Sequence, residues 1–190
     1  MRSDLKLAAK TALQNLYWAR RLAPSLLAEP PIAPKSMLFV CKGNICRSPF
    51  AALFAAAVAR SYHWDLETNS AGLRASPSES PPAEALTAAQ PYGVDLSQHV
   101  PHPIAPAMLR NAALVLVMEP SQATSLFGEH PEVREKTRLL SAFDIPVSLI
   151  DFSVPRYAIL DPYGLPHAAF VDCYARIARC IQGLFERIYR

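Results

Sequence analysis

The sequence predicts an α/β domain with a small parallel sheet of about four strands, helices on both faces of the sheet, and an extra N-terminal helix. Strand and helix patterns alternate from Met37 onward, as in parallel sheets whose strands are joined by helices. Residues 37–40 (MLFV) and 114–118 (LVLVM) are uninterrupted apolar runs, typical of strands that are covered on both faces. The chain has 190 residues, of which 51% are hydrophobic, so we expect one domain with a sizeable core.

Composition narrows the class of protein. The net charge of +3 is too small to favour a nucleic-acid partner. The sequence has four cysteines, no secretory signal and no apolar run approaching about 18 residues. These features predict a soluble protein of a reducing compartment, with the cytoplasm as the default.

The first 35 residues are predicted to be an appendage to the domain at 36–190. Residues 1–23 place apolar side chains at helical spacing among several basic ones, which predicts an amphipathic helix. The proline-rich stretch at 24–34 cannot be a continuous helix and is predicted to be a linker. The helix either packs on its own domain or forms a partly ordered tail, or else it docks on a partner or an anionic membrane surface.

The elements of the domain follow from apolar periodicity and from the positions of proline and glycine. Pro49 suits a first helical turn, Pro91 is expected to close a helix, and Ser121 is expected to cap one. The expected strands are 37–40, 68–71, 114–118 and 137–140, and the expected helices are 49–62, 83–90, 105–112, 121–127 and 167–190.

The stretch CKGNICRSP at 41–49 carries the chemistry. An apolar strand stops at Cys41, and Pro49 opens a helix, so the loop between them offers backbone N–H groups to an anion. Gly43 and Asn44 tolerate the left-handed backbone that such a loop needs. N–H dipoles and a nearby guanidinium favour the thiolate of Cys41, and the planar fork of Arg47 matches two oxygens of a tetrahedral anion. We infer a phosphate-sized site with a sulfur nucleophile.

The string C-x-G-N-x-C-R-S-P resembles the signature of the low-molecular-weight protein tyrosine phosphatases, and the resemblance covers about residues 36–190. It implies a phosphotyrosine phosphatase I-like fold and a phosphomonoesterase that forms a cysteinyl-phosphate on Cys41, with Arg47 stabilising the transition state. Asp161, in the late string DPYG, is the implied general acid, and Tyr163 the implied wall for the substrate ring. We expect no cofactor, and no metal because the motif lacks metal-ligand spacing.

The resemblance also implies supporting roles. Asn44, Ser70 and His99 correspond to a polar network that fixes the phosphate-binding loop, and Ser48 would donate to the Cys41 thiolate. Glu119 stands where the family usually has Asp. The implied loop and support residues are Lys42, Gly43, Asn44, Ile45, Cys46, Ser48, Ser70 and His99.

The substrate cleft is assigned to Tyr163, Ser76 and Glu119. Lys42 and Ser76 replace residues that are commonly apolar in the family, so the cleft should be more polar and open. Ile45 keeps its floor apolar and favours an aromatic ester, whereas protein-arginine phosphatases of this family tend to have Thr there. We expect a phosphorylated protein or a small aryl phosphate as substrate, and no nucleic acid. The connection at 144–155 also looks longer than usual.

Two alternatives stay open. One is a non-catalytic phosphate-binding module, against which the combination of Cys41, Arg47 and Asp161 argues, because a binding module needs no general acid. The other is an arsenate reductase on the same fold, which needs two further cysteines in a mobile middle segment. Residues 73–126 contain no cysteine, and Cys173 and Cys180 are predicted to be core residues of the terminal helix.

Overall fold

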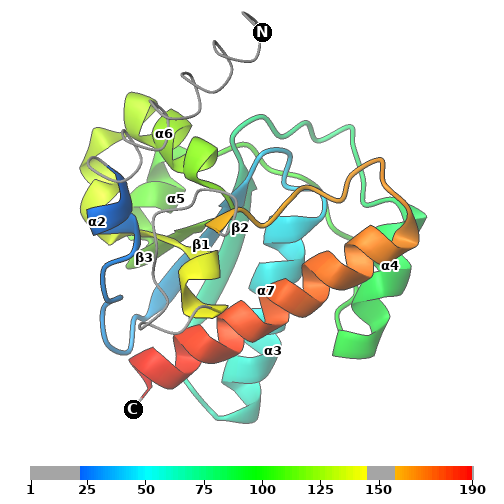
Figure 1. Ribbon diagram of the computed structural model, residues 1–190, viewed down its shortest axis with the longest axis horizontal. Coiled ribbons are helices and arrows are strands. Elements are labelled where there is room, and N and C mark those ends of the chain that lie inside the picture. The colour runs from blue at the N-terminus through cyan, green and yellow to red at the C-terminus, as the bar shows by residue number, and fades with distance from the viewer. Residues whose placement is uncertain (1–21, 145–156, 190) are drawn as a thin grey trace, which may run out of the picture.

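The computed structural model describes residues 22–144 and 157–189. Its sheet has four strands, all paired in parallel, in the order β2-β1-β3-β4 (Figure 1). The strands are β1 (Ser36–Cys41), β2 (Glu67–Gly72), β3 (Leu114–Val117) and β4 (Thr137–Leu139). The predicted α/β class and all four expected strands are therefore confirmed.

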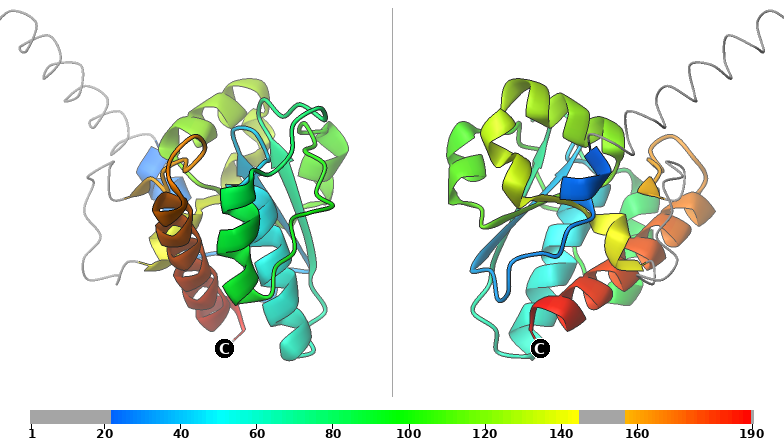
Figure 2. Two further views of the ribbon diagram at one scale, coloured as in Figure 1. Left: turned by 90° about the vertical axis from the view of Figure 1, so that its right-hand side faces the viewer. Right: turned by 60° about the vertical axis from the view of Figure 1, so that its left-hand side comes forward.

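The described helices flank this sheet, and α3, α4 and α7 run together on one side of it (Figure 2). The α-helices are α2 (Ala23–Leu26), α3 (Arg47–Ser61), α4 (Ala83–Ala89), α5 (Pro106–Asn111), α6 (Pro120–Glu129) and α7 (His167–Ile188). The 3-10 helices are η2 (Gln90–Tyr92), η3 (Pro131–Lys136) and η4 (Leu140–Asp144).

Alternate residues of β1 enter two separate hydrophobic cores. Met37 and Phe39 pack in the core that includes α3, α4 and α7. Leu38 and Val40 pack in the core on the opposite face, with side chains from α2, α5 and α6. Successive side chains of a strand point to opposite faces, so an uninterrupted apolar run is the pattern that a two-sided burial requires. This explains why the strand could be identified from the sequence.

Two helix ends differ from expectation. α6 begins at Pro120, and its N-cap residue is Glu119, so the predicted serine cap is wrong. The hydroxyl of Ser121 instead donates to the Glu119 carboxylate over 3.4 Å. α4 ends at Ala89, one residue before the predicted end, and Pro91 lies in the 3-10 helix η2 that follows, whose C-cap residue is Gly93 with a φ of 67°. Proline fits the first turn of either helix type, since its missing N–H would have no partner there.

The predicted helix at residues 1–23 lies outside the described residues except for its last two, and so does most of the connection at 144–155. Leu26, in the segment assigned to the linker, is buried in the core, and so is Leu22, which precedes that segment. Arg138, beside them in β4, donates to the carbonyl of Ala28 over 2.8 Å. This part of the linker therefore packs on the domain. None of the described helices is both long enough and apolar enough to span a membrane.

Candidate active site

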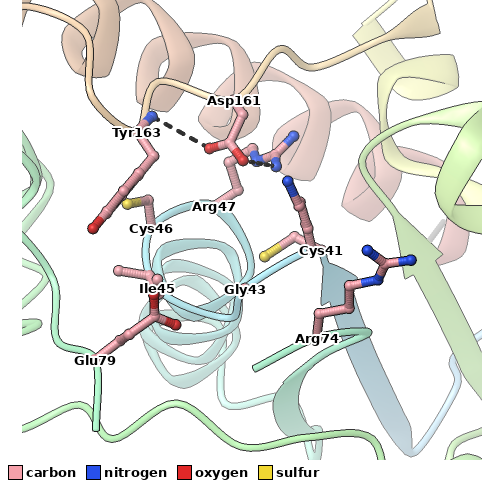
Figure 3. Close-up of a pocket in the computed structure, with 10 residues that line it drawn as sticks. Cys41, Gly43, Ile45, Cys46, Arg47, Arg74, Glu79, Asp161 and Tyr163 are labelled. Carbon is pink, nitrogen blue, oxygen red and sulfur yellow. Dashed lines mark hydrogen bonds and ion pairs between the residues drawn. The ribbon is translucent and has the colours of Figure 1, made fainter. Parts of the chain in front are cut away.

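A pocket lies at the carboxyl ends of the strands, where β1 ends in Cys41 and its neighbour β2 ends in Gly72 (Figure 3). Carboxyl ends of parallel strands are where ligands bind in open α/β sheets. The volume of about 180 Å³ is small beside typical sites for whole cofactors, and suits one phosphorylated side chain. The lining residues are Cys41, Lys42, Gly43, Ile45, Cys46, Arg47, Arg74, Glu79, Asp161 and Tyr163.

The Cys41 sulfur is held by its own loop. The backbone N–H of Asn44 donates to Cys41 Sγ over 3.2 Å, and Ser48 Oγ lies 3.0 Å from the same sulfur. Asn44 adopts the left-handed conformation with a φ of 54°, whereas Gly43 is not among the residues with positive φ. The expected left-handed position is thus taken by the asparagine. Both groups can donate a hydrogen bond to Cys41 Sγ, so they fix the position of the sulfur.

Asn44 also joins the loop to its surroundings. Its side-chain amide donates to Ser48 Oγ and to Ser70 Oγ, each over 2.9 Å. Its backbone carbonyl lies 2.7 Å from His99 Nε2, and its side-chain oxygen accepts the backbone N–H of His102 over 2.8 Å. The structure therefore places Asn44, Ser70 and His99 in one network. Burial lowers the pKa of His99, and the hydrogen bond to the carbonyl opposes this shift only in part.

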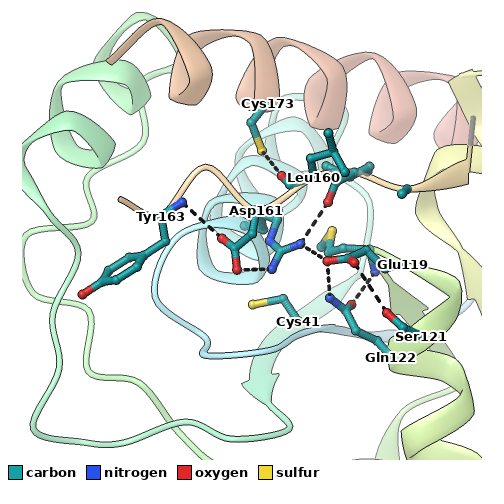
Figure 4. Close-up of polar contacts among 12 residues, drawn as sticks. Cys41, Glu119, Ser121, Gln122, Leu160, Asp161, Tyr163 and Cys173 are labelled. Atoms are coloured by element: carbon teal, nitrogen blue, oxygen red, sulfur yellow. Dashed lines mark hydrogen bonds and ion pairs between the residues drawn. The ribbon is translucent and has the colours of Figure 1, made fainter. Parts of the chain in front are cut away.

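Arg47 is almost fully buried, with 1% of its side chain exposed, and contacts three acceptors (Figure 4). Nη1 donates to the Glu119 carboxylate and, over 2.9 Å, to the carbonyl of Ile159, and Nη2 donates to Asp161 over 2.5 Å. Burial works against its charge, but the neighbouring Cys41 and carboxylates outweigh burial and raise the pKa of Arg47. Arg47 is a fixed cation.

One donor of this guanidinium is left over. Nε of Arg47 is buried and has no hydrogen-bond partner among the described residues. A buried donor without an acceptor is costly, and such groups in native proteins call for an explanation. An oxyanion in the pocket, which Arg47 lines, would supply the acceptor.

Asp161 reaches the pocket on the segment before α7. The N–H of Ile159 donates to the carbonyl of Met118 over 2.9 Å, which ties this segment to the end of β3. Asp161 Oδ1 accepts the backbone N–H of Tyr163 over 3.3 Å, while Oδ2 accepts from Arg47. Tyr163 is 55% exposed and lines the mouth of the pocket.

Two residues assigned to the substrate cleft do not line the pocket. Ser76 lies in the exposed loop after β2, where its hydroxyl is 2.8 Å from that of Ser78. Glu119 points to Arg47 instead, because it follows β3 directly and a buried guanidinium needs a counter-charge. The cleft is instead lined by Arg74 and Glu79, which the sequence analysis missed.

The four cysteines are free and buried. Burial raises the pKa of Cys46 strongly, and the nearby charge of Asp161 adds to the shift. Burial also raises the pKa of Cys173 and that of Cys180 to about 12 each. The prediction that Cys173 and Cys180 are core residues is confirmed.

Comparison with known proteins gives a consistent result. Residues 36–190 match the family model described as low molecular weight phosphotyrosine protein phosphatase. The chain is 30% identical over 155 residues to the low molecular weight protein-tyrosine-phosphatase Etp of Escherichia coli K12, covering 82% of this chain and 95% of Etp. It is 32% identical over 156 residues to the probable phosphatase AmsI of Erwinia amylovora, covering 82% and 98%.

Solved structures agree with this match. The crystal structure of the Erwinia amylovora tyrosine phosphatase AmsI has a TM-score of 0.71 and 30% identity, covering 83% of this chain and 95% of that one. A low molecular weight protein tyrosine phosphatase from T. tengcongensis has a TM-score of 0.70 and 32% identity, covering 80% and 97%.

Proposed function

The chain belongs to the low molecular weight phosphotyrosine protein phosphatase family, and we propose that it hydrolyses phosphotyrosine in proteins through a cysteinyl-phosphate on Cys41. The observation that carries the proposal is the buried Nε of Arg47, which has no partner among the described residues in a pocket that Cys41 also lines. A phosphate group offers the acceptor that this donor lacks and the phosphorus atom that the sulfur would attack.

In the first step Cys41 Sγ attacks phosphorus, so that an S–P bond forms while the bond from phosphorus to the ester oxygen breaks. Arg47 and the backbone N–H groups of the loop stabilise the equatorial oxygens as charge builds up on them. Ser48 Oγ, 3.0 Å from the sulfur, can donate to the thiolate and assist its departure when water cleaves the intermediate. The sulfur leaves as the thiolate that began the cycle.

Asp161 is the proposed general acid. It lines the same pocket on a separate segment, and it must be protonated to give its proton to the departing oxygen. It then acts as the base toward the attacking water. Its hydrogen bonds to Arg47 and to the N–H of Tyr163 fix the carboxyl group at the mouth, where the leaving oxygen emerges.

The preference for an aromatic ester rests on Tyr163 and Ile45. The first offers an exposed ring at the mouth of the pocket and the second an apolar side chain on its lining. Flat aromatic rings pack well against such surfaces. The relatives named above are tyrosine phosphatases, which supports the same substrate.

The test is hydrolysis of a series of aryl phosphates by wild type, Cys41→Ser and Asp161→Asn. Cys41→Ser should be inactive on every member, and a chelator should leave the wild type unaffected. Asp161→Asn should lose about 10²- to 10⁴-fold in kcat on phenyl phosphate, with a much smaller loss on a strongly electron-poor ester that needs little proton assistance. Equal losses across the series would refute the role of Asp161, and an active Cys41→Ser would refute the mechanism.

We further propose that the enzyme works in the cytoplasm, where its cysteines stay reduced. Contact of the predicted helix at residues 1–23 with a partner or an anionic membrane surface stays a prediction, because it concerns residues outside the described ranges.

A further inference from the structure

Two cations at the mouth of the pocket have no carboxylate partner among the described residues. Lys42 and Arg74 both line the pocket and are exposed, and neither side chain forms a hydrogen bond or ion pair within the described part of the chain. Arg47, in contrast, is neutralised by Glu119 and Asp161. The positive charge that remains available to a substrate therefore lies at the mouth.

Backbone hydrogen bonds fix these two residues side by side. The N–H of Leu73 donates to the carbonyl of Cys41 over 3.0 Å, and the N–H of Arg74 donates to the carbonyl of Lys42 over 2.8 Å. The pairing of β1 with β2 thus continues past the end of both strands. Lys42 and Arg74 are therefore neighbours on the backbone, and both are exposed, whereas residues 44–46 of the loop that holds the sulfur are buried.

The side of the pocket opposite Arg74 carries an aromatic ring, and among the described residues no exposed cation other than Lys42 and Arg74 lines the pocket. Figure 3 shows Arg74 and Tyr163 on opposite sides of Cys41, with Glu79 on the side of Ile45. A phosphorylated ring that packs on Tyr163 would leave the rest of its peptide at the mouth. An acidic side chain there would be attracted at the Arg74 wall and repelled by Glu79.

We propose that Lys42 and Arg74 form a second anion subsite, which selects a phosphotyrosine that neighbours an acidic residue in the substrate. The inference rests on the proposed phosphatase function and adds the sequence context of the substrate. The subsite binds the carboxylate of the neighbouring residue, whereas the loop and Arg47 bind the phosphoryl group. Exposed ion pairs contribute modestly, so the subsite selects among substrates and does not determine whether they react.

The test compares two phosphotyrosine peptides that differ only in Glu or Gln next to the phosphorylated residue. At low ionic strength the wild type should prefer the acidic peptide by about two- to fivefold in kcat/KM. Arg74→Gln should weaken this preference, because Lys42 remains, and Arg74→Glu, whose charge opposes that of Lys42, should remove it. High salt should weaken the preference, because it screens exposed charges.

The matched control is Arg60→Gln. Arg60 is an exposed arginine in the last turn of α3, about 20 Å of helix away from the loop, so its removal changes the net charge equally. This variant should keep the wild-type preference. A wild type without preference, or an Arg74→Gln variant that keeps it undiminished, overturns the subsite.

Failure of the proposed function would look different. If the wild type hydrolysed neither peptide, the phosphatase proposal would fail. The subsite would then be tested by binding of the same two peptides, now carrying a fluorescent label, to Cys41→Ser. Tighter binding of the acidic peptide that weakens on adding Arg74→Gln supports the subsite. Equal affinity for both peptides overturns it.

Discussion

Gly72, the last residue of β2, packs directly against the phosphate-binding loop, and its replacement by alanine should displace that loop. An alanine Cβ would lie 2.9 Å from the backbone nitrogen of Asn44 and 2.9 Å from the carbonyl carbon of Gly43. Because carbon contacts are ordinarily about 3.5 Å or longer, the backbone must move by roughly 0.6 Å. The same nitrogen of Asn44 donates to Cys41 Sγ over 3.2 Å, so the displacement reaches the nucleophile.

A misplacement of about 1 Å near reacting groups can cost about 10²-fold in rate, and overpacking typically costs about 1–3 kcal/mol of stability. We therefore expect Gly72→Ala to lose about 10- to 100-fold in kcat/KM on an aryl phosphate and to have a lower Tm. Gly128→Ala in α6 is the matched control, since its Cβ would meet nothing within 4 Å. That variant should keep full activity, and its free energy of unfolding should rise by about 0.5–1 kcal/mol, because glycine destabilises a helix interior relative to alanine. Wild-type kcat/KM in Gly72→Ala would refute the reasoning.

Three further outcomes can be checked. Burial lowers the pKa of His99 below its usual 6.5. As pH falls, the unfolded chain therefore binds a proton at His99 more readily than the folded chain, and the free energy of unfolding decreases. His99→Asn should therefore show a smaller fall in Tm between about pH 7 and pH 5 than wild type, and an equal fall would contradict this. Mild peroxide should form a reversible disulfide between Cys41 and Cys46, and mass spectrometry that finds sulfinic acid at Cys41 without a bridged peptide would disprove it. Gly183→Ala should lower Tm clearly, because its Cβ would meet the carbonyl oxygen of Phe143, and an unchanged Tm would count against this contact.

The central strands were predictable because a strand that is buried on both faces of the sheet has a continuous run of apolar residues. All residues of β3 are buried, with Leu114 and Leu116 in one core and Val115 and Val117 in the other. A continuous apolar run of this kind is typical of a parallel strand that is buried on both faces. The start of α6 was not predictable from Ser121 alone, because a helix can begin at Pro120 without a side-chain cap.

The phosphate-binding loop was predictable because its main parts are contiguous in sequence, from Cys41 to Ser48. The cleft was not, because the irregular segment after β2 decides which side chains face the pocket. It turns Arg74 and Glu79 inward, while Ser76 contacts Ser78. A usable signal existed for Arg74, since residues that follow a parallel strand gather at the carboxyl edge of the sheet.

His102 was missed for a different reason. It supports the loop through its backbone N–H, which donates to Asn44 Oδ1, and any residue except proline has that group. Side-chain identity therefore carries no signal at this position. His99, whose ring contacts the same residue, could be assigned from its side chain.

The charges around Arg47 explain why a site for a dianion needs more than this arginine. Arg47, Glu119 and Asp161 together carry one negative charge when both carboxyl groups are ionised, so this trio alone would not attract phosphate. The carboxylates orient the guanidinium and leave its Nε for the ligand. Attraction must then come from the loop N–H dipoles, which salt screens little, and from Lys42 and Arg74 at the exposed mouth, which salt screens strongly. We therefore expect kcat/KM to fall as salt is added, and to fall less in a variant that lacks the charge of Lys42 or Arg74.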